Sequence, residues 1–204
     1  MQLRQIRLKW KIATAGSIIL LAGLGILYLW MIREMPHNPK NLCDVFHDKK
    51  DWYPDALAAG KKWKVPISVI MAVMYHESSF RAAARPPRSK ILFIFPGPRP
   101  TSAYGYAQAV DATWVQYQKE NKAENARRNH FADAVDFIGW YCQSSRSRCG
   151  IALNDAYNLY LAYHEGHSGF LRGSYNAKPW LIEKAKKVRH LSKIYARQMQ
   201  VCGF

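Results

Sequence analysis

The chain has 204 residues, of which 49% are apolar and 22% are charged. This composition excludes a wholly disordered protein and suits one well-filled domain with an appendage. The formal net charge is +16, and residues 34–204 alone carry 25 basic and 14 acidic side chains, a net charge of +11. Such a surface favours acidic partners: nucleic acid, anionic lipid headgroups or a polymer that bears carboxylates.

Residues 13–32 form a run of 20 residues without a charge. As a helix this run spans the roughly 30 Å hydrocarbon core of a bilayer, so we expect a transmembrane anchor. Basic residues precede the run, whereas Arg33 and Glu34 nearly cancel after it. Residues 1–12 are therefore expected to be a basic cytoplasmic tail. A cleaved signal peptide is the alternative, but the sequence after the run offers no small-residue cleavage site.

The rest of the chain is predicted to be a short linker and a helical domain. Residues 33–42 are polar and carry two prolines, which is typical of a linker, and residues 43–204 form the domain. Apolar residues at helical spacing, together with capping residues and early prolines, predict its helices. The predicted helices cover 48–64, 65–80, 112–128 and 130–145, then a segment from Asn154 or Asp155 to Gly166, and a last helix that starts at Pro179.

The segment 82–101 differs from the rest because its five prolines exclude a continuous helix. At its centre lie five apolar residues, Ile91–Phe95, bounded by proline and glycine. They suit a short strand, a buried plug or a lid over a cleft, and a strand or plug is the simpler expectation. The predicted fold class is therefore all-α, with at most a small irregular or β-like insertion around residue 93.

Glu77 is the first candidate for catalytic chemistry. The predicted helix 65–80 carries an apolar stripe that ends at Glu77. The stripe consists of Ile70, Val73 and Met74. Partial loss of water at such a position raises the pKa of a carboxyl toward the range useful for a general acid. The alternative is a last-turn residue that reaches solvent or pairs with an arginine.

All four cysteines follow the predicted anchor, and an even count outside the cytoplasm suggests two disulfides. Four cysteines allow three pairings. Cys142 and Cys149 are close enough in sequence to close a small loop, and that pairing would leave Cys43 to pair with Cys202. The longer closure would tie the start of the domain to its end and stabilise it by a few kcal/mol. A zinc site is the alternative, but no pair of cysteines has CxxC spacing.

Three polar segments interrupt the helical pattern: residues 77–80 (ESSF), residues 105–108 (GYAQ) and residues 162–164 (AYH). Their order resembles that of lytic transglycosylases with a soluble-lytic-transglycosylase (SLT) domain, relatives of goose-type lysozyme. ESSF matches that family's Glu-Ser-x-Phe motif, GYAQ keeps the Gly and Gln of Gly-Leu-Met-Gln, and AYH keeps the Ala and Tyr of Ala-Tyr-Asn. The resemblance covers residues 65–196 in order and spacing.

The resemblance implies a lysozyme-like fold and peptidoglycan glycan strands as the substrate. Glu77 would protonate the glycosidic oxygen between N-acetylmuramic acid and N-acetylglucosamine, then take the proton of the C6 hydroxyl as a 1,6-anhydro ring closes. The sugar's own acetamido group would replace a second carboxylate, so no metal or cofactor is expected, and Glu165 is the one alternative acid. The implied substrate-binding residues are Ser78, Tyr104, Gly105, Tyr106, Gln108, Tyr163, His164 and Glu165.

The resemblance also assigns roles to these residues. Tyr163 is expected to contact the catalytic sugar or to orient Glu77, and Gln108 to bind an acetamido or hydroxyl group. Tyr104 and Tyr106 are expected to line the groove or to stack on sugars.

Ser78 would steady the end of the catalytic helix, and a simple helix-end role is an equal alternative.

Two features depart from the family pattern. His164 stands where the family has Asn, which puts the sugar contacts there in doubt, and the connection 80–105 is longer than expected. Its extra residues, 91–95, would reshape one end of the groove.

With the anchor 13–32, these expectations describe a single-pass protein of the bacterial inner membrane whose catalytic domain lies in the periplasm. The rival is a non-catalytic peptidoglycan-binding or assembly component of an envelope-spanning secretion machine that keeps the fold. A metalloprotease is disfavoured because residues 164–167 (HEGH) are one residue short of His-Glu-x-x-His. No nucleic acid is expected as a partner, because no nucleic-acid motif accompanies the charge.

Overall fold

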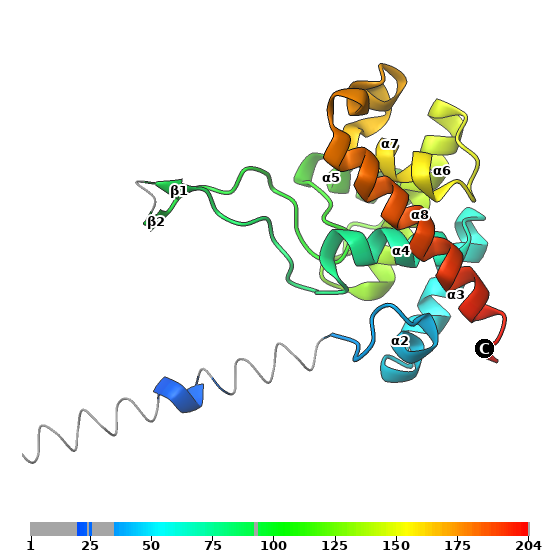
Figure 1. Cartoon of the computed structure of the whole chain (residues 1–204), viewed down its shortest axis with the longest axis horizontal. Helices are drawn as coiled ribbons and strands as arrows, with labels where there is room; N and C mark the ends of the chain where they lie inside the picture. The colour runs from blue at the N-terminus through cyan, green and yellow to red at the C-terminus, as the bar shows by residue number, and fades with distance from the viewer. Residues whose placement is uncertain (1–19, 24, 26–34, 92–93, 204) are drawn as a thin grey trace, which may run out of the picture. The chain divides into compact units, whose positions relative to one another are not determined.

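The computed structural model describes residues 20–23, 25, 35–91 and 94–203 (Figure 1). Pro36–Phe204 forms one compact unit, which is described here by itself. Within the described residues no helix is long and apolar enough to cross a membrane. The predicted anchor, 13–32, lies almost wholly outside the described residues, as does the predicted tail, 1–12, so both stay predictions.

The compact unit is mainly helical, which confirms the predicted fold class at this level. Its elements in chain order are α2 (Leu42–Asp48), α3 (Trp52–Trp63), α4 (Ile67–Ser78), β1 (Lys90–Ile91), β2 (Phe95–Pro96), α5 (Asp111–Asn121), α6 (Phe131–Cys149), α7 (Ala156–Leu171), the 3-10 helix η1 (Ser174–Ala177) and α8 (Pro179–Met199). Helix α2 was not predicted, and it begins where the Asn41 side chain accepts a hydrogen bond from the backbone N–H of Cys43 at 3.0 Å. Helix α5 ends at Asn121, well before the predicted residue 128, and α6 continues four residues past the predicted 145.

Helix α4 lies at the centre of the unit, in contact with α3, α6, α7 and α8. Seven successive residues, 68–74, are buried. The prediction of one apolar face was therefore too narrow, because a helix that is apolar all round is a core helix. Glu77 lies in the last turn of this core helix, so the fold brings a carboxyl to the edge of the hydrophobic core.

The two ends of the unit are joined by the disulfide Cys43–Cys202, which closes a separation of 159 residues. Two hydrogen bonds support the same junction: the N–H of Leu42 donates to Oε1 of Gln198 at 2.9 Å, and the hydroxyl of Tyr195 donates to the carbonyl of Pro39. In the loop-entropy picture a closure of this length is worth about 5 kcal/mol. The junction fixes α8 against the first helix of the domain.

The predicted disulfide between Cys142 and Cys149 was wrong, because both residues are free thiols in α6. They lie seven residues apart in one helix, a rise of about 10 Å, whereas disulfide-bonded Cα atoms are rarely more than about 7 Å apart. Burial of Cys142 raises the pKa of its thiol to about 12. That thiol behaves as a small apolar core side chain.

The insertion forms a short antiparallel hairpin in which Lys90 pairs with Pro96 and Ile91 with Phe95. Figure 1 shows this hairpin standing away from the helices. Ile94 is 80% exposed and Phe95 is 60% exposed. The predicted small β-like insertion is therefore confirmed, but as a hairpin in which Ile91 and Phe95 belong to different strands and not as one strand. The predicted buried plug is wrong for the described residues, because the flanking prolines extend the chain away from the core.

Candidate active site

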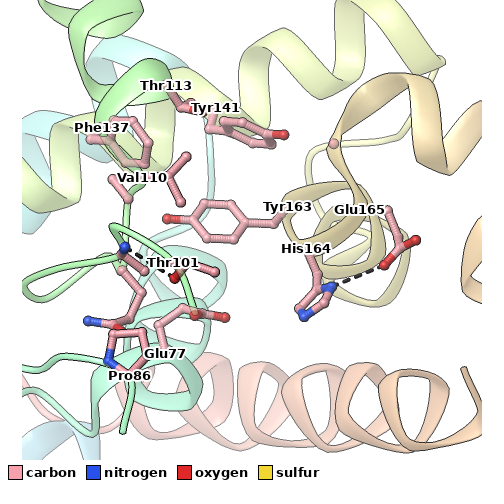
Figure 2. A pocket seen from close by; sticks show the side chains of 14 residues that line it. Glu77, Pro86, Thr101, Val110, Thr113, Phe137, Tyr141, Tyr163, His164 and Glu165 are labelled. Atoms are coloured by element: carbon pink, nitrogen blue, oxygen red, sulfur yellow. Dashed lines mark hydrogen bonds and ion pairs between the residues drawn. The ribbon is translucent and has the colours of Figure 1, made fainter. Parts of the chain in front are cut away.

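A cleft of about 490 Å³ opens where the end of α4, the loop before α5, α6 and the middle of α7 meet (Figure 2). Of the nine residues singled out from the sequence as catalytic or substrate-binding, five line it: Glu77, Gln108, Tyr163, His164 and Glu165. Its other lining residues include Pro86, Thr101, Ala103, Val110, Thr113, Phe137 and Tyr141. Residues from three separate motifs of the sequence are thus brought into one cavity.

Glu77 reaches the cleft because the chain turns sharply after the last turn of α4. Ser79 and Phe80 both have left-handed backbone angles, with φ of 52° and 60°, and the N–H of Ser79 donates to the carbonyl of Tyr75 at 2.8 Å. Phe80 is fully buried and packs against the rings of Trp52 and Tyr75. Burial of Phe80 anchors the turn, and the turn holds the Glu77 carboxyl toward the cleft beside Tyr163 (Figure 2).

The environment of Glu77 favours its protonated form. Burial raises the pKa of this carboxyl, while Lys184, the hydroxyl of Tyr160 and His164 act in the opposite direction without cancelling the shift. The carboxyl also lies at the negative end of α4, which disfavours an anion. Glu77 therefore keeps its proton to a higher pH than an exposed glutamate does.

Tyr160 is a neighbour of Glu77 that the sequence did not single out. Its side chain is buried, and its hydroxyl makes no hydrogen bond of ordinary geometry within the described part of the chain. It nevertheless lies close enough to Glu77 to favour the anion of that carboxyl. Periodicity placed Tyr160 among core residues of its helix, and only the approach of α4 to α7 makes it a neighbour of Glu77.

Glu165 has the opposite environment. Its side chain is only 4% exposed, and it accepts hydrogen bonds from Nζ of Lys178 at 2.7 Å, from Nδ1 of His164 at 3.1 Å and from the hydroxyl of Ser174. Burial alone would raise the pKa of Glu165, but these three donors outweigh it and lower the pKa to about 2. Glu165 is therefore an anion that ties α7 to η1 and to the start of α8.

The backbone of α7 explains why Tyr163, His164 and Glu165 lie together at the cleft. The side chain of Asp155 begins the helix by accepting from the N–H of Asn158 at 3.1 Å, as the sequence predicted for Asn154 or Asp155. Gly166 then interrupts the helix with φ of 72° and ψ of 160° before a further turn. The predicted stop at Gly166 is thus a kink.

Tyr163 and Gln108 hold the loop that forms one wall. The hydroxyl of Tyr163 donates to the carbonyl of Ala107 at 2.6 Å, so its own hydrogen is directed to this loop. Nε2 of Gln108 donates to the carbonyls of Ala84 and Gly105 at 2.9 and 2.8 Å. Both amide hydrogens of Gln108 are then engaged, which leaves its Oε1 as the atom that can accept from a ligand.

Four predicted binding residues do not line the cleft: Ser78, Tyr104, Gly105 and Tyr106. Ser78 is 1% exposed and its hydroxyl donates to the carbonyl of Met74 at 3.2 Å, which is a helix-end role. Tyr106 is a core residue packed against Trp52 and Phe131. Its predicted role as a sugar-stacking residue is therefore wrong, because the loop turns that ring inward.

Gly105 and Tyr104 serve the structure of the same loop. A Cβ on Gly105 would lie 2.0 Å from the carbonyl oxygen of Arg128, and its φ is +80°, so only glycine fits this close approach. The guanidinium groups of Arg85 and Arg128 lie 4.2 and 5.5 Å from the centre of the Tyr104 ring. Arg128 also donates to the carbonyls of Ser102 and Ala109.

The wall residues that sequence reasoning missed fall in two groups. Phe137 and Tyr141 belong to α6, where helical spacing made them indistinguishable from core residues. Pro86 and Thr101 lie on the two sides of the hairpin's base, so the cleft-forming part of the insertion is its proline-rich base and not its apolar centre.

The histidines of the sequence HEGH have separate partners. His164 contacts Glu165, while Nε2 of His167 lies 3.0 Å from the hydroxyl of Ser145 and its ring stacks on Tyr141. Among the described residues no group of three or more His, Cys, Asp or Glu side chains is placed to hold a metal ion.

A family model described as "Transglycosylase SLT domain" matches residues 13–202. Comparison with curated proteins and with solved structures gave no match. The family match covers most of the chain, and the resemblance expected from the three motifs agrees with it. The chain therefore belongs to the transglycosylase SLT domain family, whose members are lytic transglycosylases of peptidoglycan.

Proposed function

We propose that this chain cleaves the β-1,4 bond between N-acetylmuramic acid and N-acetylglucosamine without water, with Glu77 as the acid and then the base. The observation that carries the proposal is the contrast between two carboxyls in one cleft. Glu77 has a raised pKa, and Glu165 is held as an anion by three donors. Of the two carboxyls, Glu77 keeps its proton to the higher pH and is therefore the better proton donor.

In the first step the Glu77 proton goes to the glycosidic oxygen, and the bond from that oxygen to C1 of the muramic acid residue breaks. The carbonyl oxygen of the 2-acetamido group bonds to C1 in its place, which supplies the role of a second carboxylate. In the second step the C6 oxygen bonds to C1 and displaces the acetamido oxygen, while the C6 hydroxyl proton returns to Glu77. The products are a free 4-hydroxyl and a 1,6-anhydro end.

The chain supplies a proton donor whose anion is stabilised only moderately. Burial holds the proton on Glu77 at the start, and Lys184, His164 and Tyr160 favour the anion that forms midway. Tyr163 and the loop that it holds keep Gln108 at the cleft wall, where Oε1 can accept the N–H of an acetamido group. One carboxyl that gives up and takes back a proton is enough for this mechanism, because the acetamido group of the substrate replaces the second carboxylate.

We also propose the location that this substrate requires. Residues 13–32 anchor the chain in the bacterial inner membrane, residues 1–12 stay in the cytoplasm, and the linker 33–42 leads to a periplasmic catalytic domain. The 20-residue uncharged run supports the anchor. The disulfide Cys43–Cys202 supports an oxidising compartment for the domain.

The test is the product spectrum of purified chain on purified peptidoglycan. We expect muropeptides with 1,6-anhydro ends, and we expect Glu77→Gln to lower their rate of release by at least about 10²–10⁴-fold, because it removes the general acid. Glu124→Gln, at an exposed glutamate away from the cleft, is the matched control and should keep full activity.

Three outcomes would contradict parts of the proposal. Unchanged release by Glu77→Gln would exclude the mechanism. Products heavier by one water would show hydrolysis. Binding of peptidoglycan with no release by the unmodified chain would favour the non-catalytic assembly component.

A further inference from the structure

A second cavity, of about 560 Å³, lies between α4, α8 and the segment before α2. It shares no lining residue with the cleft that contains Glu77. Its polar wall consists of Lys40, His76, Glu183, Lys186, Lys187 and His190. We call it the α4–α8 cavity.

Several cations at or near the cavity come from different segments of the chain and act on His76. Burial lowers the pKa of His76, and Lys184, Lys187 and Lys40 lower it further. A hydrogen bond with the backbone of Lys187 acts in the opposite direction, and the resulting pKa of His76 is about 4. His76 is therefore neutral in the wall of a positively charged cavity.

The wall lacks the negative charge that would balance these cations. Glu183 is its one carboxylate, and it pairs with Lys186 at 2.6 Å on the same helix. Lys40 and Lys187 pair with no carboxylate in the described part of the chain. Like charges gathered at one cavity repel one another, and an anion between them would relieve that repulsion.

We propose that the α4–α8 cavity is a binding site for a phosphate group carried on a small organic residue or lipid headgroup. Lysine ammonium groups bind phosphate as point charges, and a histidine that becomes protonated adds a donor. The volume exceeds that needed for phosphate alone, and Leu191 and Ile194 supply apolar surface for the attached group. The site does not depend on the role of Glu77.

The charged and titratable groups that face His76 set the expected pH dependence. They are Lys40 before α2, Tyr75 on α4, and Glu183, Lys184, Lys186, Lys187 and His190 on α8. A bound phosphate anion would offset the lysines and favour protonated His76, so phosphate binding and protonation of His76 should favour each other.

The test follows the histidine ring signals by NMR in the full chain, purified in an uncharged detergent. With inorganic phosphate as the probe, we expect saturable shifts of His76 and His190 and a midpoint for His76 at least one pH unit higher. His130, which lies 3.0 Å from Asp133 in the first turn of α6, should not shift and is the internal control.

Variants separate this site from general attraction to a basic surface. Lys40→Gln with Lys187→Gln should weaken phosphate binding at least tenfold and raise the pKa of free His76. Lys193→Gln, at an exposed lysine of α8 outside the cavity, should change neither. Glu183→Gln should tighten binding, because it frees Lys186.

The sources of phosphate are distinguished by a second arm with the chain in phosphatidylglycerol or phosphatidylcholine bilayers. A shift of His76 only in phosphatidylglycerol identifies a lipid headgroup, and a shift by free phosphate alone identifies a soluble ligand. The absence of a saturable shift in both arms would overturn the proposal, as would equal binding by the double lysine variant. Neither result would bear on 1,6-anhydro product formation.

Discussion

The end of α4 and the kink of α7 each present one glutamate to the same cleft, but they give it opposite properties. Glu77 lies in the last turn of a helix buried on all sides, and its pKa is raised because burial outweighs the groups that favour its anion. Glu165 is also removed from solvent, yet three donors gathered around it lower its pKa to about 2. Burial alone therefore does not decide the role of a carboxyl in this cleft.

Magnitudes explain why the donors decide. The field at a helix end is worth about 0.3–1 kcal/mol to a nearby charge. Each hydrogen bond to a charged group is worth about 1.5–3 kcal/mol. Glu165 precedes the Gly166 kink and so also lies near a helix end, but the donors Lys178, Ser174 and His164 outweigh that effect. Among the described residues, no comparable set of three hydrogen-bond donors surrounds Glu77 at the end of α4.

The largest expected difference between the two glutamates is in their contribution to the free energy of unfolding, and it comes from Glu165 on α7. Glu165→Gln should lower the free energy of unfolding by about 1–3 kcal/mol, because it leaves Lys178 without its carboxylate; the 40% exposure of Lys178 limits the loss. Thermal unfolding of the chain in detergent measures it. Glu183→Gln, in an exposed pair, is the control and should leave the free energy of unfolding nearly unchanged.

The pH dependence of that loss follows from the lowered pKa. A carboxyl whose pKa falls on folding stabilises the fold above its unfolded value, near 4.5, and this contribution disappears as the pH falls through about 2. The difference between the chain and Glu165→Gln should therefore be full at pH 7 and shrink below pH 4.5. A difference that stays constant with pH would show that packing and not charge is responsible.

At Glu77, on α4, the corresponding substitution should change the free energy of unfolding in the opposite direction. A carboxyl whose pKa rises on folding destabilises the fold once the pH exceeds its unfolded value. Glu77→Gln should therefore stabilise the chain at pH 8 and have no such effect at pH 4. Thermal unfolding at the two pH values is the measurement. A loss of stability at pH 8 would contradict the assignment of Glu77 as a destabilised, functional acid.

A smaller effect is expected from the neighbour of Glu77 on α7. Tyr160→Phe removes a hydroxyl that favours the Glu77 anion, so the pKa of Glu77 should rise further. Cleavage requires protonated Glu77, hence the fall of kcat/KM at high pH should move upward by up to about one pH unit. Tyr117→Phe, whose hydroxyl donates to Asp136 at 2.7 Å, is the control and should leave the profile unchanged. An unmoved profile in Tyr160→Phe would exclude this role.

The sequence was sufficient for features that depend on local pattern. The core helix that ends near Glu77, the N-cap at Asp155 and the break at Gly166 all follow from spacing and residue type. The prediction of a disulfide between Cys142 and Cys149 failed because helix 130–145 was expected to end before the second cysteine, whereas α6 continues through it.

Features that depend on distant partners could not be predicted. The sequence offered Glu165 only as an alternative acid and a substrate-binding residue. Its donors Ser174 and Lys178 approach it because η1 folds back on α7. Gly105 matched a family motif, yet what requires a glycine there is the carbonyl of Arg128, 23 residues away in sequence. Motif order located the cleft, and tertiary contacts decided which motif residues line it.

A change in the hairpin should affect the properties of Glu77 and Glu165 least. Replacing Ile91–Phe95 by a two-glycine turn removes Ile94 and Phe95, which are exposed, and keeps Pro86 and Thr101 at the cleft wall. The melting temperature and the pH profile of cleavage should therefore stay unchanged. The lengths of the glycan products should change, because the hairpin extends from one wall of the cleft and long strands alone can reach it. Mass spectrometry of digests of long and short strands measures this, and a large fall in melting temperature would show that the apolar residues belong to the core.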